Sequence, residues 1–395
     1  MNSPFTAKPT IKGFIYQFKV ALLLLLQSEV DSKVSVESND DIELNDSVNG
    51  GLVQVKHHKK DSVLRDSDLD FWKSLRNWAL FSKAKNSSTS YYLITTQKTI
   101  DKSICNLLTS RNSERNTELI FNKIEEFLNE TQNKEIIKLT TYYLKLSELE
   151  KKDLINKIRI IDGGEDIQEI DELLKKEIRR STREQFLDAV YTRFISWWYR
   201  IIESHIVSNT NEPIYLRDVE TKLNDISDQF KLDSLPIDFL DLELDKDMSI
   251  KAEQRLFVKQ LEYIQTNIQT IQRAILDYYK AYAQRSQWIR DNLLIEEELI
   301  YYEKKLIDGW EELLCKIKDL HNLDTLDELA LKKLGRELYH EVIEQEIFIR
   351  KDVREPYVMR GSYHILADQN SPSIWWHPYF KEQVEKLLLE ADVSK

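Results

Sequence analysis

Residues 34–56 read Val-Ser-Val-Glu-Ser-Asn-Asp-Asp-Ile-Glu-Leu-Asn-Asp-Ser-Val-Asn-Gly-Gly-Leu-Val-Gln-Val-Lys, and the fold that we predict is built outward from them. Apolar and polar residues alternate before and after the Asn49-Gly50-Gly51 turn signal, as in half-buried strands joined by a hairpin. Alternate strand residues share a face, so Gln54 and Lys56 project from the same side of the last strand. Asp41 opens the neighbouring strand, where a short hairpin brings its carboxylate beside them.

In the surrounding sequence the spacing of apolar residues changes between the helical and the strand pattern, and these changes predict the order of the elements. Apolar residues recur at helical spacing from Ile11 to Leu25, and a second helix begins at Asp66 or Ser67. The order α-β-β-β-α-β predicts an α+β domain. Its predicted elements are a helix at 11–25, strands at 32–38, 41–44 and 52–57, a helix from 66 or 67 to about 83 and a strand at 90–96, followed by helical segments over 116–158, a strand at 158–161 and a helix at 166–180.

The second half is predicted to be helical. A heptad seam of apolar residues runs from Phe257 to Tyr282, and such a seam packs on another helix, either in the same chain or across a subunit interface. We place the domain boundary near Ser181 and expect two domains, residues 1–180 and residues 181–395. The aromatic residues around Trp197-Trp198 and Trp375-Trp376 are expected to form core or interface.

Composition limits the class of protein. The 395 residues contain two cysteines, 210 positions apart, which excludes a disulfide scaffold and a cysteine zinc site and fits a reducing compartment. The longest apolar run, residues 20–26, is far shorter than the roughly 20 residues of a membrane span. The net charge is −12, yet residues 1–110 carry 14 Lys/Arg against 12 Asp/Glu. The acidic excess therefore lies outside the N-terminal region and excludes no nucleic-acid ligand there.

The predicted cluster of Asp41, Gln54 and Lys56 has the composition that phosphodiester hydrolysis needs. Carboxylate and amide oxygens suit a hard cation such as Mg²⁺, with Mn²⁺ as an alternative ion. The metal polarises the phosphate and activates a water, while an ammonium positions that water and offsets the charge that develops. The competing interpretation is an exposed strand face with a surface salt bridge. The order of elements around the three residues favours a nuclease site.

These elements resemble the PD-(D/E)xK nuclease fold, in the Mrr-like variant with Gln at the Glu position. More narrowly, the N-terminal region is similar to the double-stranded DNA endonuclease domain of bacterial antiphage effectors, and the C-terminal half resembles the nuclease subunit of Lamassu (ABC-three-component) systems. The resemblance rests on Gly13-Phe14-Ile15-Tyr16-Gln17, Val36-Glu37, Asp40-Asp41-Ile42, Gln54-Val55-Lys56-His57-His58, Trp197-Trp198-Tyr199-Arg200, Arg360-Gly361-Ser362-Tyr363-His364 and Trp376-His377-Pro378.

The resemblance implies a role for each matched residue. Asp41 and Gln54 become metal ligands and Lys56 the catalytic lysine, while Glu37 and Gln17 match positions that line such sites. The segment after the third strand is expected to contact DNA phosphates. It comprises His57, His58, Lys59 and Lys60, of which the two histidines point to opposite faces and cannot chelate one ion together.

The resemblance also implies partners. We expect a cytoplasmic effector without a membrane, associated with an SMC-like ATPase subunit and a small accessory subunit of the same operon, which hold it inactive until it is triggered. On activation we expect a homo-oligomer that cuts duplex DNA with little sequence specificity. Two alternatives stay open: a non-catalytic assembly subunit, which the neutral Gln54 keeps in consideration, and an RNA-directed nuclease.

Overall fold

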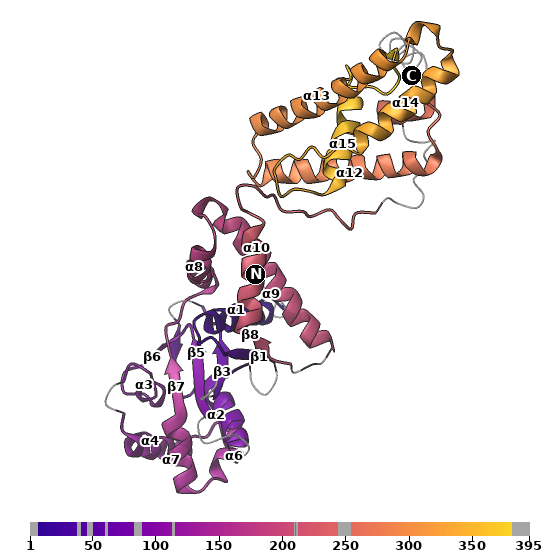
Figure 1. Ribbon diagram of the computed structural model, residues 1–395. Helices are drawn as coiled ribbons and strands as arrows, with labels where there is room; N and C mark the ends of the chain where they lie inside the picture. Colours follow the sequence, from indigo (N-terminus) through magenta and orange to yellow (C-terminus); the bar gives the residue numbers. More distant parts are fainter. Residues whose placement is uncertain are drawn as a thin grey trace. The chain divides into compact units, whose positions relative to one another are not determined.

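The computed structural model divides the chain into two compact units, which we call unit 1 (residues 1–227) and unit 2 (residues 228–395). Each unit has its own hydrophobic core and is described here by itself (Figure 1). The residues that the structure describes are 7–37, 41–45, 50–59, 62–82, 89–112, 115–208, 210, 212–243 and 254–380.

Unit 1 is built on a mixed six-stranded sheet, which confirms the predicted α+β class. The strand order is β7-β5-β3-β2-β1-β8; β3, β5 and β7 run parallel, whereas the β3–β2, β2–β1 and β1–β8 pairs are antiparallel (Figure 1). A separate parallel pair, β4 with β6, lies outside this sheet. The strands are β1 (Lys33–Val36), β2 (Ile42–Asn45), β3 (Gly50–Lys56), β4 (Val63–Leu64), β5 (Thr89–Thr95), β6 (Lys98–Thr99), β7 (Ile158–Ile161) and β8 (Ile214–Tyr215).

Helices cover both faces of this sheet. Leu52 and Leu93 point toward α2, where they join Trp72 and Trp78 in a core of fully buried side chains. On the opposite face α1 packs on β1, β2, β3 and α8. The predicted order α-β-β-β-α-β is present, with the short β4 added before α2. The helices are α1 (Lys8–Leu26), α2 (Leu69–Phe81), α3 (Ile104–Leu107), α4 (Thr117–Glu130), α5 (Lys134–Leu139), α6 (Thr141–Leu144), α7 (Glu148–Lys157) and α8 (Ile167–Ile178).

Helix α1 alone, among the described helices, is long and apolar enough by length and composition to span a membrane. A core helix passes the same test. Tyr16, Leu22 and Leu25 on α1 are almost completely buried in unit 1, whereas Ile11 and Phe14 near its start are exposed. In this structure α1 serves as a core helix of the sheet domain.

Unit 1 extends beyond the expected boundary near Ser181. It includes α9 (Leu187–Ser208), β8 and α10 (Leu216–Asp228). The indole Nε1 of Trp198 on α9 donates to the carbonyl of Phe18 on α1 at 2.8 Å, and β8 pairs with β1 at the sheet edge. These contacts tie residues 187–227 to the sheet domain rather than to the helical one.

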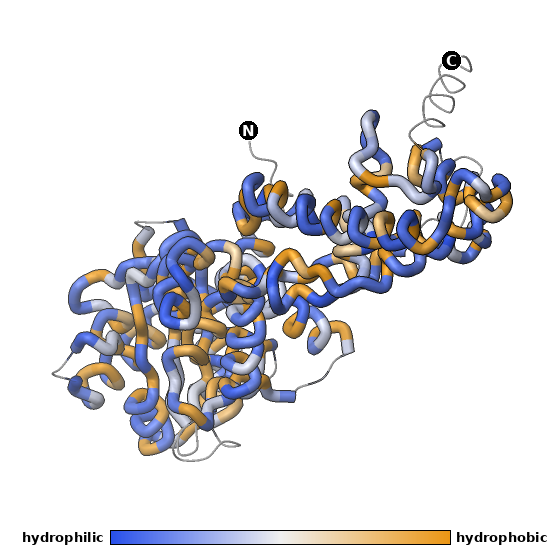
Figure 2. The backbone as a smooth tube through the Cα atoms, turned by 45° about the horizontal axis from the view of Figure 1, so that its top comes forward, coloured by the Kyte–Doolittle hydropathy of each residue, from blue (hydrophilic) through white to orange (hydrophobic). Residues whose placement is uncertain are grey.

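Unit 2 is helical, as predicted. Helix α12 crosses α15 closely at Gly361, where an added Cβ would lie 2.1 Å from the carbonyl oxygen of Asp277. Hydrophobic and hydrophilic stretches alternate along these helices in Figure 2, as in helices that bury one side. The helices are α11 (Leu256–Tyr263), α12 (Ile268–Arg290), α13 (Glu296–Leu320), α14 (Glu328–Ile343) and α15 (Pro356–Ala367).

The predicted heptad seam is interrupted. Helix α11 ends before Gln265, which has a positive φ of 58°, and Asn267 then caps α12 by accepting from the Thr270 N–H at 2.9 Å. Phe257 is buried, whereas Ile268 is 58% exposed. A turn therefore divides the apolar repeat between two helices of one core, and the seam is not one continuous coiled-coil helix.

Candidate active site

Asp41, Gln54 and Lys56 lie in mutual hydrogen-bond contact. Lys56 Nζ donates to Gln54 Oε1 at 2.9 Å and to Asp41 Oδ2 at 3.2 Å, and Gln54 Nε2 donates to Asp41 Oδ1 at 3.1 Å. The Gln54 side chain is buried, and the side chains of Asp41 and Lys56 are 20% and 23% exposed. The three polar groups thus form one cluster that solvent reaches from one side.

The register of the sheet creates this cluster. Ile42 pairs with Val53 across the antiparallel β2–β3 ladder, so Asp41 stands next to Gln54 at the point where β2 begins. The Asp41 carboxylate also accepts the backbone N–H of Val55 at 2.8 Å through Oδ2. Because β3 is held between β2 and β5, the side chains that it presents are fixed on rigid backbone.

Glu37 and Gln17 extend the cluster from two other elements. The Gln17 amide on α1 donates through Nε2 to Glu37 Oε1 and to the Asp41 carbonyl, each at 2.8 Å. Glu37 has a φ of 56°, a left-handed conformation that is costly for any residue that, unlike glycine, carries a Cβ. Gln17 therefore holds the strained end of β1 and the start of β2 in one arrangement.

The oxygens of this cluster suit a metal ion by their chemistry. Asp41 Oδ2 and Gln54 Oε1 are hard donors, and both accept hydrogen bonds from the Lys56 ammonium, which supplies the positive charge between them. Among the described residues there is no group of three or more His, Cys, Asp or Glu side chains placed to hold a metal. A cation here would depend on one carboxylate, one amide and water, and Lys56 would have to release the two oxygens.

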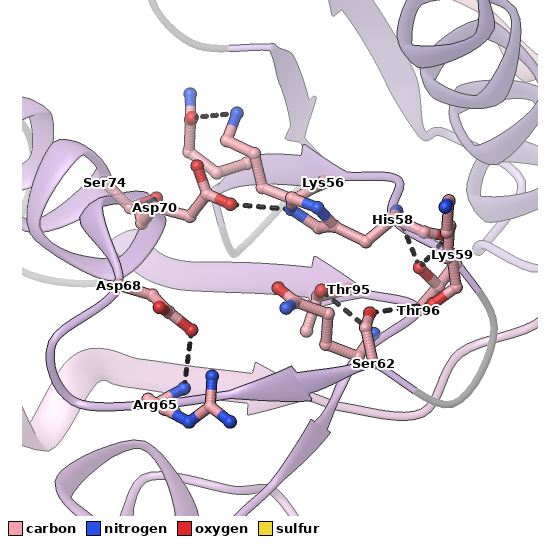
Figure 3. Close-up of polar contacts among 12 residues, drawn as sticks. Lys56, His58, Lys59, Ser62, Arg65, Asp68, Asp70, Ser74, Thr95 and Thr96 are labelled. Carbon is pink, nitrogen blue, oxygen red and sulfur yellow. Dashed lines mark hydrogen bonds and ion pairs between the residues drawn. The ribbon is translucent and has the colours of Figure 1, made fainter. Parts of the chain in front are cut away.

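The two histidines after β3 point to opposite faces, as predicted. The His57 ring lies against Tyr16 of α1, with ring centroids 5.0 Å apart, and its burial there lowers the pKa of His57 below its usual value. His58 faces α2 instead. Its Nε2 lies 2.6 Å from Asp70 Oδ2, and its backbone N–H donates to Thr96 Oγ1 at 2.9 Å (Figure 3).

Asp70 is a site residue that the sequence analysis missed. Its hydrogen bond with His58 lowers the pKa of the Asp70 carboxyl, a shift to which the charges of His58, Lys56 and Lys73 contribute and which burial opposes. Figure 3 shows the carboxylate of Asp70 reaching from α2 toward the strand that carries Lys56. No sequence pattern marked Asp70, because it is one of several acids around the start of α2.

Two further DNA contacts are predicted in the segment after β3, at Lys59 and Lys60. Lys59 follows His58 and is exposed, and its carbonyl accepts hydrogen bonds from Ser62 at 3.1 Å and 2.7 Å. The predicted contact at Lys60 lies outside the described residues.

The aromatic clusters of the C-terminal half serve as core, as expected. Trp376 and Tyr363 are completely buried, and the His364 ring stacks on Phe257 with centroids 5.1 Å apart. Burial, with a smaller contribution from the charge of Arg360, lowers the pKa of His364 to about 3. These residues pack in the core of unit 2.

Comparison with known proteins gives one family. Residues 257–384 match the model of C-terminal domain 7 of the ABC-three component systems, which supports membership of the chain in such a system. This agrees, at the level of the family, with the resemblance found in the C-terminal half of the sequence. No curated protein matches the chain.

Two solved structures are among those that match the chain at low similarity. The Cap4 SAVED/CARF-domain containing receptor of Acinetobacter baumannii with the cyclic trinucleotide 3'3'3'-cAAA shares 14% identity over 69% of this chain and 69% of its own, with a TM-score of 0.33. The Moraxella osloensis Cap4 receptor shares 13% identity over 69% of this chain and 68% of its own, with a TM-score of 0.30. Scores this low do not establish a shared overall fold.

Proposed function

We propose that this chain is the nuclease effector of an ABC-three component defence system, a metal-dependent DNA endonuclease with a PD-(D/E)xK-type domain in unit 1. The observation that carries the proposal is the contact cluster of Asp41, Gln54 and Lys56 at adjoining ends of β2 and β3. The match of residues 257–384 supports the system, and the cluster supports the chemistry.

The chemistry follows from the donor atoms. Asp41 and Gln54 would hold Mg²⁺, or Mn²⁺ as an alternative ion, which when bound polarises a phosphate and lowers the pKa of a coordinated water. Lys56 would orient the attacking water and stabilise the negative charge that develops on the phosphate. Glu37 and Gln17 keep the segment before Asp41 in position. Because no base-reading element is needed, we expect little sequence specificity.

The rest of the proposal concerns regulation. A cytoplasmic nuclease of low specificity would damage its own cell, so we infer that it is restrained by partners. We assign unit 2 to assembly with an SMC-like ATPase subunit and a small accessory subunit, and we expect a homo-oligomer after triggering. Multiple components are what an ABC-three component system implies.

Plasmid cleavage tests the activity. Supercoiled plasmid is incubated with the purified chain in Mg²⁺ or in EDTA, beside Lys56→Ala, Asp41→Asn and Lys33→Ala. Lys33 is the matched control, because it lies on β1 over the Tyr215 ring, away from the cluster. We expect nicking or linearisation in Mg²⁺ by the wild type and by Lys33→Ala, and none from the two site variants or in EDTA.

Two alternative functions give different results. Gln54 provides one negative charge less than a Glu would, and this favours a non-catalytic assembly subunit as the second candidate. Absence of cleavage of both DNA and RNA by the chain alone, and also with its operon partners and DNA ends present, would establish that alternative. A labelled RNA duplex in the same reaction identifies an RNA-directed nuclease, which would cut the RNA in preference to the DNA.

A further inference from the structure

A hollow of about 710 Å³ lies beside the candidate active site in unit 1. It opens between the segment after β3, the strand β4, the first turns of α2 and the residue pair that follows β5. His58, which is two residues beyond Lys56, forms part of its wall, and Figure 3 shows Ser62 and Arg65 on the side away from Lys56. The wall residues used below are His58, Arg65, Asp68, Asp70, Lys73 and Gln97.

The wall carries two cationic side chains, Arg65 and Lys73, beside two carboxylates, Asp68 and Asp70. Arg65 and Lys73 are exposed, and in the part of the chain that the structure describes neither side chain forms an ion pair. The two carboxylates of the wall are already engaged: Asp70 contacts His58, and Asp68 accepts the backbone N–H of Arg65 at 2.8 Å. The guanidinium and the ammonium are therefore available to an anion in the hollow.

The wall also contains a buried acceptor without a donor. Gln97 is 7% exposed, and its Nε2 donates to the carbonyl of Val63 at 3.0 Å, which fixes the orientation of the amide. Gln97 Oε1 is buried and has no hydrogen-bond partner. Leaving a buried acceptor unsatisfied is costly, so a ligand that offers an N–H or O–H group would gain by entering.

We propose that this hollow binds one nucleotide of the substrate strand, next to the phosphodiester that is cut. Phosphate oxygens only accept hydrogen bonds and match Arg65 and Lys73, whereas bases and sugars carry donors that match Gln97 Oε1. The inference rests on the proposed nuclease function and adds to it a strand-binding subsite formed by α2 and β4. His58 lies in the wall of the hollow and two residues after Lys56, so the hollow adjoins the candidate active site.

The salt dependence of DNA binding tests this subsite. A fluorescent DNA duplex is titrated with the full chain in EDTA at several salt concentrations, for the wild type, Arg65→Gln, Lys73→Gln and Arg76→Gln. Arg76 is the matched control, because it is exposed on α2, bonds to Asn77 and is not part of the wall. Each subsite variant is expected to weaken binding and to reduce the slope of log K against log salt by about 1, while Arg76→Gln leaves both unchanged.

A second variant examines the buried acceptor. Gln97→Met removes Oε1, and we expect it to weaken binding of the same duplex without reducing the salt slope, because no charge is lost. Its thermal unfolding is measured alongside, so that a loss of folding is recognised. Arg65 and Lys73 are exposed, so their variants report on the subsite even where Gln97→Met does not fold.

The outcomes separate the subsite from the nuclease proposal. Plasmid cleavage that depends on Lys56, together with Arg65→Gln and Lys73→Gln binding like Arg76→Gln, overturns the subsite and leaves the nuclease intact. A wild-type chain that neither binds the duplex nor cuts plasmid with its partners present overturns both. Reduced slopes in the two subsite variants support the assignment.

Discussion

The side-chain amide of Gln17 donates a hydrogen bond to the backbone carbonyl of Asp41 at 2.8 Å, although 24 residues separate them along the chain. The same Nε2 atom also donates to the Glu37 carboxylate. A helix on one face of the sheet therefore fixes the backbone of Asp41, whose carboxylate contacts Gln54 and Lys56 on the other face. The position of the candidate metal ligand therefore depends on the packing of α1.

This relationship predicts a positioning role for Gln17. Gln17→Met keeps a side chain of similar length but replaces the amide and so removes both hydrogen bonds. We expect a reduced rate of plasmid cleavage with a stability loss of about 1 kcal/mol. Gln27→Met is the control, because Gln27, the residue that directly follows the same helix, bonds to Glu177 and not to the site. Equal cleavage by the two variants would contradict the role.

A truncation tests where unit 1 ends. A chain ending at residue 227 keeps α9 and β8 and should unfold cooperatively. A chain ending at residue 180 loses the Trp198 bond to α1 and the β8 partner of β1, so its core and sheet edge become exposed. Circular dichroism and size-exclusion chromatography compare the two. A shorter chain that is monomeric and equally stable would place the boundary near residue 180.

The close contact at Gly361 predicts that a single added methyl group lowers the stability of unit 2 strongly. A Cβ at Gly361 would meet the backbone of Asp277, so Gly361→Ala must separate α12 from α15 and should cost about 3 kcal/mol or more. Gly13→Ala on α1 is the matched control, because nothing lies within 4 Å of its added Cβ. Without a clash, that change should stabilise the chain by about 0.5–1 kcal/mol. If thermal unfolding shows Gly361→Ala to be more stable than Gly13→Ala, the close contact of α12 with α15 is refuted.

His364 predicts an acid-dependent stability of unit 2. Its pKa is about 3 in the folded chain and near 6.5 when unfolded, so the unfolded chain binds the additional proton. The contribution of His364 to the free energy of unfolding is complete above pH 6.5. It falls as the pH is lowered toward 3, by about 1.4 kcal/mol per pH unit. His364→Phe keeps the aromatic stack and should lose this dependence. Urea unfolding at pH 7, 6 and 5 compares the two, and parallel pH profiles would exclude the assignment.

Some of the site could be predicted from local pattern. The period of two on β3 places Gln54 and Lys56 on one face, and the antiparallel pairing of β2 with β3 brings Asp41 back beside them. Of the predicted turn, Gly50 and Gly51 are the first residues of β3, and Asn49 lies outside the described residues. These are short-range relationships, because alternation and turn chemistry act over a few residues. The class of fold and the opposite directions of His57 and His58 followed in the same way.

The remaining features were decided by tertiary structure. Asp70 and Gln97 come from elements that are separated from β3 in the sequence, and their residue types are common on any protein surface. The assignment of α9 to unit 1 depends on contacts with distant segments, such as the bond from Trp198 to the Phe18 carbonyl and the ring contact of Tyr199 with Phe18. The apolar repeat after Phe257 continued through Gln265, where the backbone turns. Periodicity determines which side of an element is buried, whereas the partner that buries it is selected only when distant segments pack together.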